Sequence, residues 1–248
     1  MALKEEFAKS GALLFQWRSY LPLVFLPLFL VAMRDLAHVS ADDSLGERWG
    51  FFCIGVSFAG LALRAFVVGQ TPARTSGRNT REQVADSLNT TGMYSVVRHP
   101  LYLGNFIAWT GVAMFTQSFL VVLVSVLAFA LYYERIMFAE EKFLREKFRG
   151  DFDRWADRTP AFVPRFSQWR KSAVPFSWGL AAEREYSGMF AIVVTYSVLE
   201  LARGWFQRGT AHVDPAWAIF FVAGTAAYVW LRSLKKKRRR AASVSSRL

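Results

Sequence analysis

The chain of 248 residues contains a single cysteine, and only 20% of its residues are charged. Cys53 cannot form an intrachain disulfide, so disulfide redox chemistry and a cysteine-rich metal site are both excluded. No internal repeat of fixed period is present. No small-residue cleavage site follows the first apolar run, which carries Arg18, Pro22 and Pro27. This run is therefore not a typical signal peptide.

What the chain has in abundance is apolar surface, because 53% of its residues are hydrophobic and they gather in long runs. A helix that spans a bilayer needs about 20 mostly apolar residues. We therefore predict an all-α fold, a polytopic transmembrane helix bundle with about six spans. The expected spans cover residues 12–33, 49–69, 101–117, 118–138, 186–206 and 215–233.

The charges divide unevenly between the segments that connect these spans. Acidic residues dominate 34–48, whereas Lys and Arg are concentrated in 70–100, in 134–185 and in the tail, and the formal net charge is +12. Cytosolic loops carry an excess of Lys and Arg, so we expect both termini in the cytoplasm, in a bacterial inner membrane. The basic run 235–240 would then contact anionic lipid headgroups, at about 1 kcal/mol per residue. Nucleic-acid binding is not expected.

Polar residues crowd the predicted membrane boundaries at three places. They are Arg-His-Pro-Leu-Tyr-Leu-Gly at 98–104, Glu-Glu at 140–141, and the segment 158–164. The boundary between the third and fourth spans is marked only by the short polar segment 116–118, which predicts a tight helical hairpin. Two antiparallel helices of similar length, each rising 1.5 Å per residue, return the chain near its start. Because charges at a membrane boundary are costly unless paired or used, we predict that these clusters form one site.

Beyond the fourth span, the aromatic residues between 134 and 155 recur at roughly helical spacing. This pattern predicts a cytosolic extension of that helix with an amphipathic face, interrupted at Gly150. Pro160, Pro164 and Pro175 then favour an irregular, aromatic-rich loop, which could lie in the membrane interface or cover a pocket.

The motifs in this order resemble the isoprenylcysteine carboxyl methyltransferase and phospholipid methyltransferase superfamily. The resemblance includes Gly-Met-Tyr, 92–94, ahead of the Arg-His motif, and covers about residues 88–166. It implies that S-adenosyl-L-methionine binds in a pocket capped by the amphipathic helix and the loop after the hairpin, and that the acceptor enters from the membrane. We therefore divide the chain into N-terminal helices with a basic loop (1–87), a methyltransferase core (88–180), and C-terminal helices with a basic tail (181–248).

The resemblance implies cofactor-binding roles for His99, Tyr102, Gly104, Glu140 and Glu141. His99 and Tyr102 are three residues apart and can both face the cofactor's carboxylate or adenine. Gly104 allows a ligand close to the backbone, or else serves helix packing. Glu140 and Glu141 point about 100° apart on a helix. We favour Glu141 as the residue that accepts from the cofactor's amino group or ribose.

The candidate catalytic residues are Arg98 and Arg158. Methyl transfer requires alignment of the reacting atoms, which can supply about 7–11 kcal/mol of barrier reduction. An anionic carboxylate or phosphate acceptor needs no base, whereas an amine does, so the arginines favour an anion. Arg74, Arg78 and Arg81 are candidate substrate-binding residues for a lipid headgroup. The alternative for these three is an ordinary basic loop.

Two other functions compete with the methyltransferase. NADPH-dependent membrane reductases of sterol-reductase type carry a similar Arg-His pair and proline turn, but they lack the paired glutamates found here. A non-catalytic membrane protein or transporter would place charges within helices. Arg64, Glu200 and Arg203 are the candidates for such a role, and the last two can simply pair at i, i+3. We therefore predict an S-adenosylmethionine-dependent membrane methyltransferase that acts on a lipid or lipidated acceptor in the bilayer.

Overall fold

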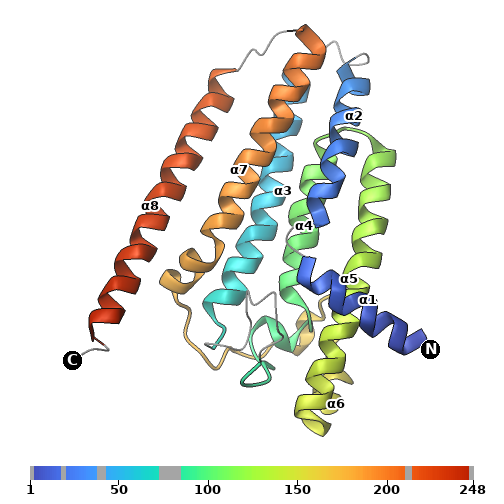
Figure 1. Ribbon diagram of the computed structural model, residues 1–248, viewed down its shortest axis with the longest axis vertical. Coiled ribbons are helices and arrows are strands. Elements are labelled where there is room, and N and C mark those ends of the chain that lie inside the picture. The colour runs from blue at the N-terminus through green and yellow to red at the C-terminus, as the bar shows by residue number, and fades with distance from the viewer. Residues whose placement is uncertain (1–2, 18–20, 38–42, 73–84, 210–213, 246–248) are drawn as a thin grey trace.

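The computed structural model describes residues 3–17, 21–37, 43–72, 85–209 and 214–245, and within these ranges it contains no strand, only an isolated bridge between Gly92 and Arg170 (Figure 1). The all-α prediction is confirmed. Arg74, Arg78 and Arg81 lie outside the described residues. The helical elements are α1 (Leu3–Trp17), η1 (Leu21–Phe25), α2 (Leu26–Ala37), α3 (Asp43–Gly69), η2 (Met93–Ser95), α4 (Pro100–Met114), α5 (Phe119–Phe148), α6 (Gly150–Ala156), η3 (Phe166–Gln168), α7 (Trp178–Arg208) and α8 (Pro215–Ser245).

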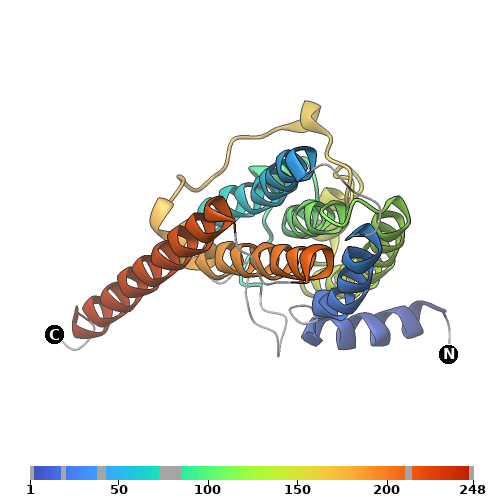
Figure 2. The same cartoon turned by 90° about the horizontal axis from the view of Figure 1, so that it is seen from above.

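Four of the described helices, α3, α5, α7 and α8, are long and apolar enough to cross a membrane. The shorter helices α2 and α4 run alongside them in the same bundle, which agrees roughly with the prediction of about six spans (Figure 1). The expected first span, 12–33, is not a single helix. Helix α1 lies across the bundle near one end, whereas α2 runs parallel to the long helices of the bundle (Figures 1 and 2). Pro22 lies in η1, between α1 and α2. Proline lacks the amide donor that the interior of an α-helix requires, so a single helix through this position is disfavoured.

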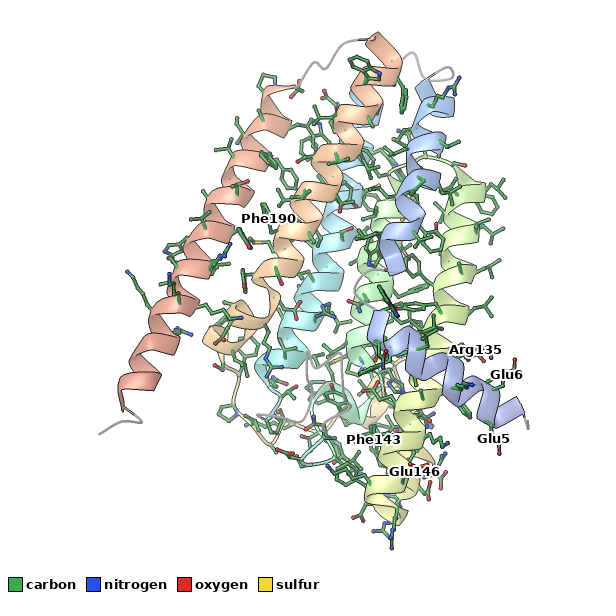
Figure 3. The ribbon with its side chains drawn as sticks, viewed as in Figure 1. Glu5, Glu6, Arg135, Phe143, Glu146 and Phe190 are labelled. Carbon is green, nitrogen blue, oxygen red and sulfur yellow. The ribbon has the colours of Figure 1, made fainter. Side chains whose placement is uncertain are left out.

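Helix α1 is held across the bundle by contacts with α5. The guanidinium carbon of Arg135 on α5 lies 3.4 Å from the centroid of the Phe7 ring on α1. Figure 3 shows Arg135 beside α1, with Glu5 and Glu6 toward the outer end of that helix. A cation over an aromatic ring is attracted by the ring's negative face, so this contact fixes the crossing.

The hairpin of α4 and α5 has the predicted tight turn. Ser118 caps α5, since its hydroxyl accepts from the amide of Val121 at 3.4 Å. Helix α5 continues to Phe148, which confirms the extension beyond residue 138. The interruption falls at Arg149, where φ is 47°, and Gly150 instead begins α6.

Both chain termini lie at the same end of the bundle as residues 85–99 and 157–177, and we call this the loop end (Figure 1). The largest buried hydrophobic cluster among the described residues contains Phe29 of α2, Phe115 just after α4, Tyr196 and Leu199 of α7, and Trp217 of α8. A separate cluster around Tyr102 and Tyr133 joins α4 to α5.

Helices α3 and α4 approach closely at glycines. A Cβ atom added at Gly104 would lie 2.6 Å from Cγ of Arg64 and 2.8 Å from the carbonyl oxygen of Gly60. Small residues permit such close contact between membrane helices. Of the two roles considered for Gly104, the contacts fit helix packing, because the absence of a side chain lets α3 approach α4 closely.

We expect Gly104→Ala to destabilise the protein by about 1–3 kcal/mol, because the added methyl overpacks the α3–α4 contact. Gly55→Ala on α3 is the matched control, since its Cβ would meet nothing within 4 Å. Thermal unfolding in detergent measures both variants. Equal melting temperatures for Gly104→Ala and the unchanged protein would contradict this view of the contact.

Candidate active site

The first and third sequence motifs run side by side at the loop end. The amide of Arg98 donates to the carbonyl of Pro160 at 2.9 Å, and that of His99 donates to Ala161 at 3.2 Å. His99 is the residue immediately before α4, whose first residue is Pro100. A proline is favoured at this position because the first helical residue needs no amide donor. The segment after α6 is thus held against the start of α4.

The second motif joins them through the side chain of Glu141. Its Oε1 atom lies 3.0 Å from Nε2 of His99 and 2.8 Å from Nε of Arg98. The second ring nitrogen of His99, Nδ1, lies 3.6 Å from Oε2 of Glu140. Arg98 also donates from Nη1 to the carbonyl of Ala156 at 2.7 Å. One carboxylate therefore connects α5 to the start of α4, and the arginine connects both to α6.

The electrostatics of this cluster centre on His99, which is buried. Burial by itself lowers the pKa of His99, but hydrogen bonds and charge from Glu140 and Glu141 outweigh it and raise the pKa above the ordinary 6.5. A protonated imidazole donates from both nitrogens. Two carboxylates facing the two ring nitrogens fit that state.

Aromatic side chains form the rest of the surroundings. The rings of His99 and Tyr102 are stacked at 5.7 Å between centroids, and Tyr102 is stacked on Tyr133 of α5 at 5.3 Å. Phe162 meets Phe106 edge to face at 5.4 Å, which seats the segment after α6 on α4. Such pairs contribute about 0.5–1.5 kcal/mol beyond the area that they bury.

The structure brings Arg98, His99, Tyr102, Glu140 and Glu141 together, as the hairpin argument required. Two other predicted site residues stand apart from them. Gly104 faces α3, and Arg158 is exposed just after α6, outside the cluster of charges.

Sequence reasoning missed the contact that anchors α6. The indole Nε1 of Trp155 donates to the carbonyl of Tyr94 at 2.9 Å, so α6 is fixed to the loop before the Arg-His motif. The indole N–H of a partly buried Trp usually has a hydrogen-bond partner, so Trp155 itself could have indicated from the sequence that α6 is anchored to another segment. Next to Tyr94 lies a cavity of about 210 Å³, lined by neutral residues from 67–72, 87–94 and 173–174.

The chain thus has the features of an integral membrane protein with a cluster of charged side chains at the open end of the α4–α5 hairpin. Comparison with known proteins shows which family shares these features. Residues 49–151 match the family of phospholipid methyltransferases. The chain is also 27% identical over 150 residues to protein-S-isoprenylcysteine O-methyltransferase B of Arabidopsis thaliana, which covers 56% of this chain and 72% of that protein. These two matches confirm the predicted resemblance to the isoprenylcysteine and phospholipid methyltransferase superfamily.

Two bacterial relatives carry names of another kind. The nickel-cobalt-cadmium resistance protein NccN of Alcaligenes xylosoxydans xylosoxydans is 38% identical over 134 residues, which is 52% of this chain and 59% of that protein. The cobalt-zinc-cadmium resistance protein CzcN of Cupriavidus metallidurans is 44% identical over 85 residues, which is 34% of this chain and 39% of that protein. The chain therefore spans about three fifths and two fifths of these two relatives. No solved structure matches the chain.

Proposed function

We propose that this membrane methyltransferase uses S-adenosyl-L-methionine to methylate an anionic carboxylate or phosphate on a lipid or lipidated acceptor in the bilayer. The observation that carries the proposal is the set of contacts among Arg98, His99 and Glu141, closed over by the segment 156–162. We expect such a site, at the end of the bundle and covered by a loop, to admit a water-soluble cofactor from the aqueous side and a lipid from the bilayer.

The residues present fit this cofactor chemically. Its amino acid portion carries an ammonium and a carboxylate, and the cluster offers carboxylates beside positive charges. The Glu140 side chain is 32% exposed and lies 3.6 Å from His99, whereas Glu141 is 18% exposed and held at short range by two partners. Glu140 is thus the carboxylate more open to the ammonium or ribose. These contacts support Glu140 in the role that the sequence favoured for Glu141.

The cofactor supplies a methyl group on a positively charged sulfur. The chain's own residues bind, orient and exclude water. Arg98 is committed to Glu141 and to the carbonyl of Ala156, so it positions the site. Arg158 is exposed beside the same segment, and we assign it the role of orienting an anionic acceptor oxygen. Such an oxygen needs no base.

We also infer that the protein lies in a bacterial inner membrane and that its loop end faces the cytoplasm. Both termini lie at this end (Figure 1). Helix α8 brings a basic run there, and Lys235 lies 3.7 Å from a carboxylate oxygen of Glu183 on α7. Anionic lipid headgroups would attract the rest of that run, at about 1 kcal/mol per residue.

The direct test is titration of the purified protein with S-adenosylmethionine and, separately, with NADPH. We expect saturable binding of the first and none of the second. Mass spectrometry of membrane lipids with and without the protein should then show a species heavier by one methylene. Binding of NADPH instead would support the reductase, and binding of neither would contradict the proposed function.

A further inference from the structure

A second charged group lies between the helices near the loop end, separate from the cluster around His99. Arg64 on α3 makes a two-pronged ion pair with Glu185 on α7, from Nε to Oε2 at 2.9 Å and from Nη2 to Oε1 at 2.8 Å. Its remaining nitrogen, Nη1, donates to Oδ1 of Asn105 on α4 at 2.7 Å. Glu185 is buried, with 5% of its surface exposed. One guanidinium thereby joins three helices.

The contacts continue from Asn105 to the candidate active site. The Asn105 side chain also lies close to the Tyr133 hydroxyl on α5. Since its carbonyl oxygen accepts from Arg64, its amide group is the part that faces the tyrosine. Tyr133 is stacked on Tyr102, and Tyr102 is stacked on His99. A continuous path of contacts thus runs from Glu185 to the ring that faces both site glutamates.

Stability alone does not account for a charged pair at this place. Removing two ions from water costs several kcal/mol per ion, and well-packed apolar side chains of similar volume are often as stable or more so. Ionisable groups within membrane helices are rare and usually have a function. The geometry of this pair is also specific, because a flat guanidinium held at three nitrogens fixes the direction in which Asn105 points.

We propose that Arg64 and Glu185 are positioning residues for the active site: they hold Asn105, and through it Tyr133 and Tyr102, so that the His99 ring stays directed at Glu140 and Glu141. This inference rests on the proposed function. It gives α7 a part in the reaction, although Glu185 lies outside the segment 49–151 that matches the family.

The chain contains a matched control for this pair. Glu200 and Arg203, also on α7, are joined at 2.9 Å and are 7% and 8% exposed. They form their contact within one helix, at i, i+3, and the guanidinium carbon of Arg203 lies 5.8 Å from the centroid of the Phe115 ring, at the opposite end of α4 from His99. Replacement of either pair by Met removes two buried charges from the same helix bundle, and only the first replacement frees Asn105.

The experiment compares Arg64→Met/Glu185→Met with Glu200→Met/Arg203→Met. Each double variant keeps apolar volume in place of the pair, so that the fold survives. We expect similar melting temperatures for the two. For the first alone, kcat/KM for S-adenosylmethionine should fall by about 2- to 30-fold, the range found when residues along a coupled network are changed. Tyr133→Phe should reproduce this fall, and its combination with Arg64→Met/Glu185→Met should add little, because both cut one path.

A second readout requires no activity. The chain has 3 histidines, so carbon-13 labelling of the imidazoles gives a simple NMR spectrum. The His99 signal, identified by its loss in His99→Asn, should shift in Arg64→Met/Glu185→Met and stay in place in Glu200→Met/Arg203→Met. An unmoved His99 signal together with unchanged kinetics would overturn the inference. Failure of the unchanged protein to bind S-adenosylmethionine would instead defeat the proposed function, and the NMR comparison would still decide the positioning role.

Discussion

Replacement of Glu140 by Gln should reduce the affinity for S-adenosylmethionine by about 10- to 150-fold while the protein stays folded. The physical reason is the loss of one hydrogen bond between charged groups, about 1.5–3 kcal/mol. Glu140 is the more exposed of the two glutamates, and its contact with His99 is long, at 3.6 Å. Because the Glu140 side chain is 32% exposed and that of Glu141 is 18% exposed, substitution of Glu140 should lower the stability of the protein less than substitution of Glu141. Isothermal titration in detergent measures the affinity.

Glu141→Gln is the matched variant and should behave differently. Glu141 holds Arg98 at 2.8 Å and His99 at 3.0 Å, so the amide would leave both cations with a weakened partner. We expect a lower melting temperature and faster hydrogen exchange at 156–161, because Arg98 joins Glu141 to that segment. If Glu141→Gln instead weakens the cofactor at unchanged stability, and Glu140→Gln has no effect, the roles given to the two glutamates are reversed.

The pH dependence of stability separates these variants further. The folded-state pKa of His99 is raised above 6.5 by Glu140 and Glu141, against the effect of burial. Protonation of His99 therefore stabilises the fold fully below its unfolded pKa, and this contribution is lost as the pH rises through the folded pKa. In Glu141→Gln the folded pKa should move down, and the loss of stability on raising the pH should become smaller. Chemical unfolding at a series of pH values from 6 upward, spaced about one unit apart, measures this.

The sequence could predict where the site lies because that conclusion needs only helix lengths. Residues 98–104 stand at the start of α4, and residues 140–141 stand in α5 well before its end at Phe148, so the antiparallel packing of α4 on α5 brings the motifs together. The extension of α5 followed in the same way from the spacing of aromatic residues. Both depend on period and length, which are local properties of a chain.

The pairing of particular side chains could not be predicted. Glu140 and Glu141 differ by about 100° on a helix, and the rotation of α5 relative to α4 decides which one meets Arg98. The Arg64–Glu185 pair joins residues 121 positions apart on different helices, and Glu185 stands so near the start of α7 that it looks like an ordinary boundary charge. The break between α1 and α2 depends on how α1 packs against α5, and the hydropathy of a single segment gives no information about such packing.

The basic loop remains a prediction about the acceptor. Replacing Arg74, Arg78 and Arg81 by Gln should raise the KM for the acceptor and leave cofactor affinity unchanged, because these residues are expected to bind the anionic headgroup before reaction. Steady-state kinetics with the acceptor found by lipid mass spectrometry measures both quantities. Unchanged kinetics would mean that the loop is basic only for reasons of membrane topology.

Arg158→Gln should have the opposite signature, a kcat lower by about 100-fold with a similar KM. A contact that orients the reacting oxygen acts mainly in the transition state, and small misplacement of reacting groups costs about that factor. Because Arg158 is exposed and lies outside the charged cluster, the melting temperature should not change. Arg154→Gln is the control, since Arg154 is an exposed neighbour paired with Asp151. If Arg154→Gln lowers kcat as much as Arg158→Gln, the effect is one of general surface charge. If an amine proves to be the methylated group, Arg158 has no anion to orient and its substitution should leave kcat intact.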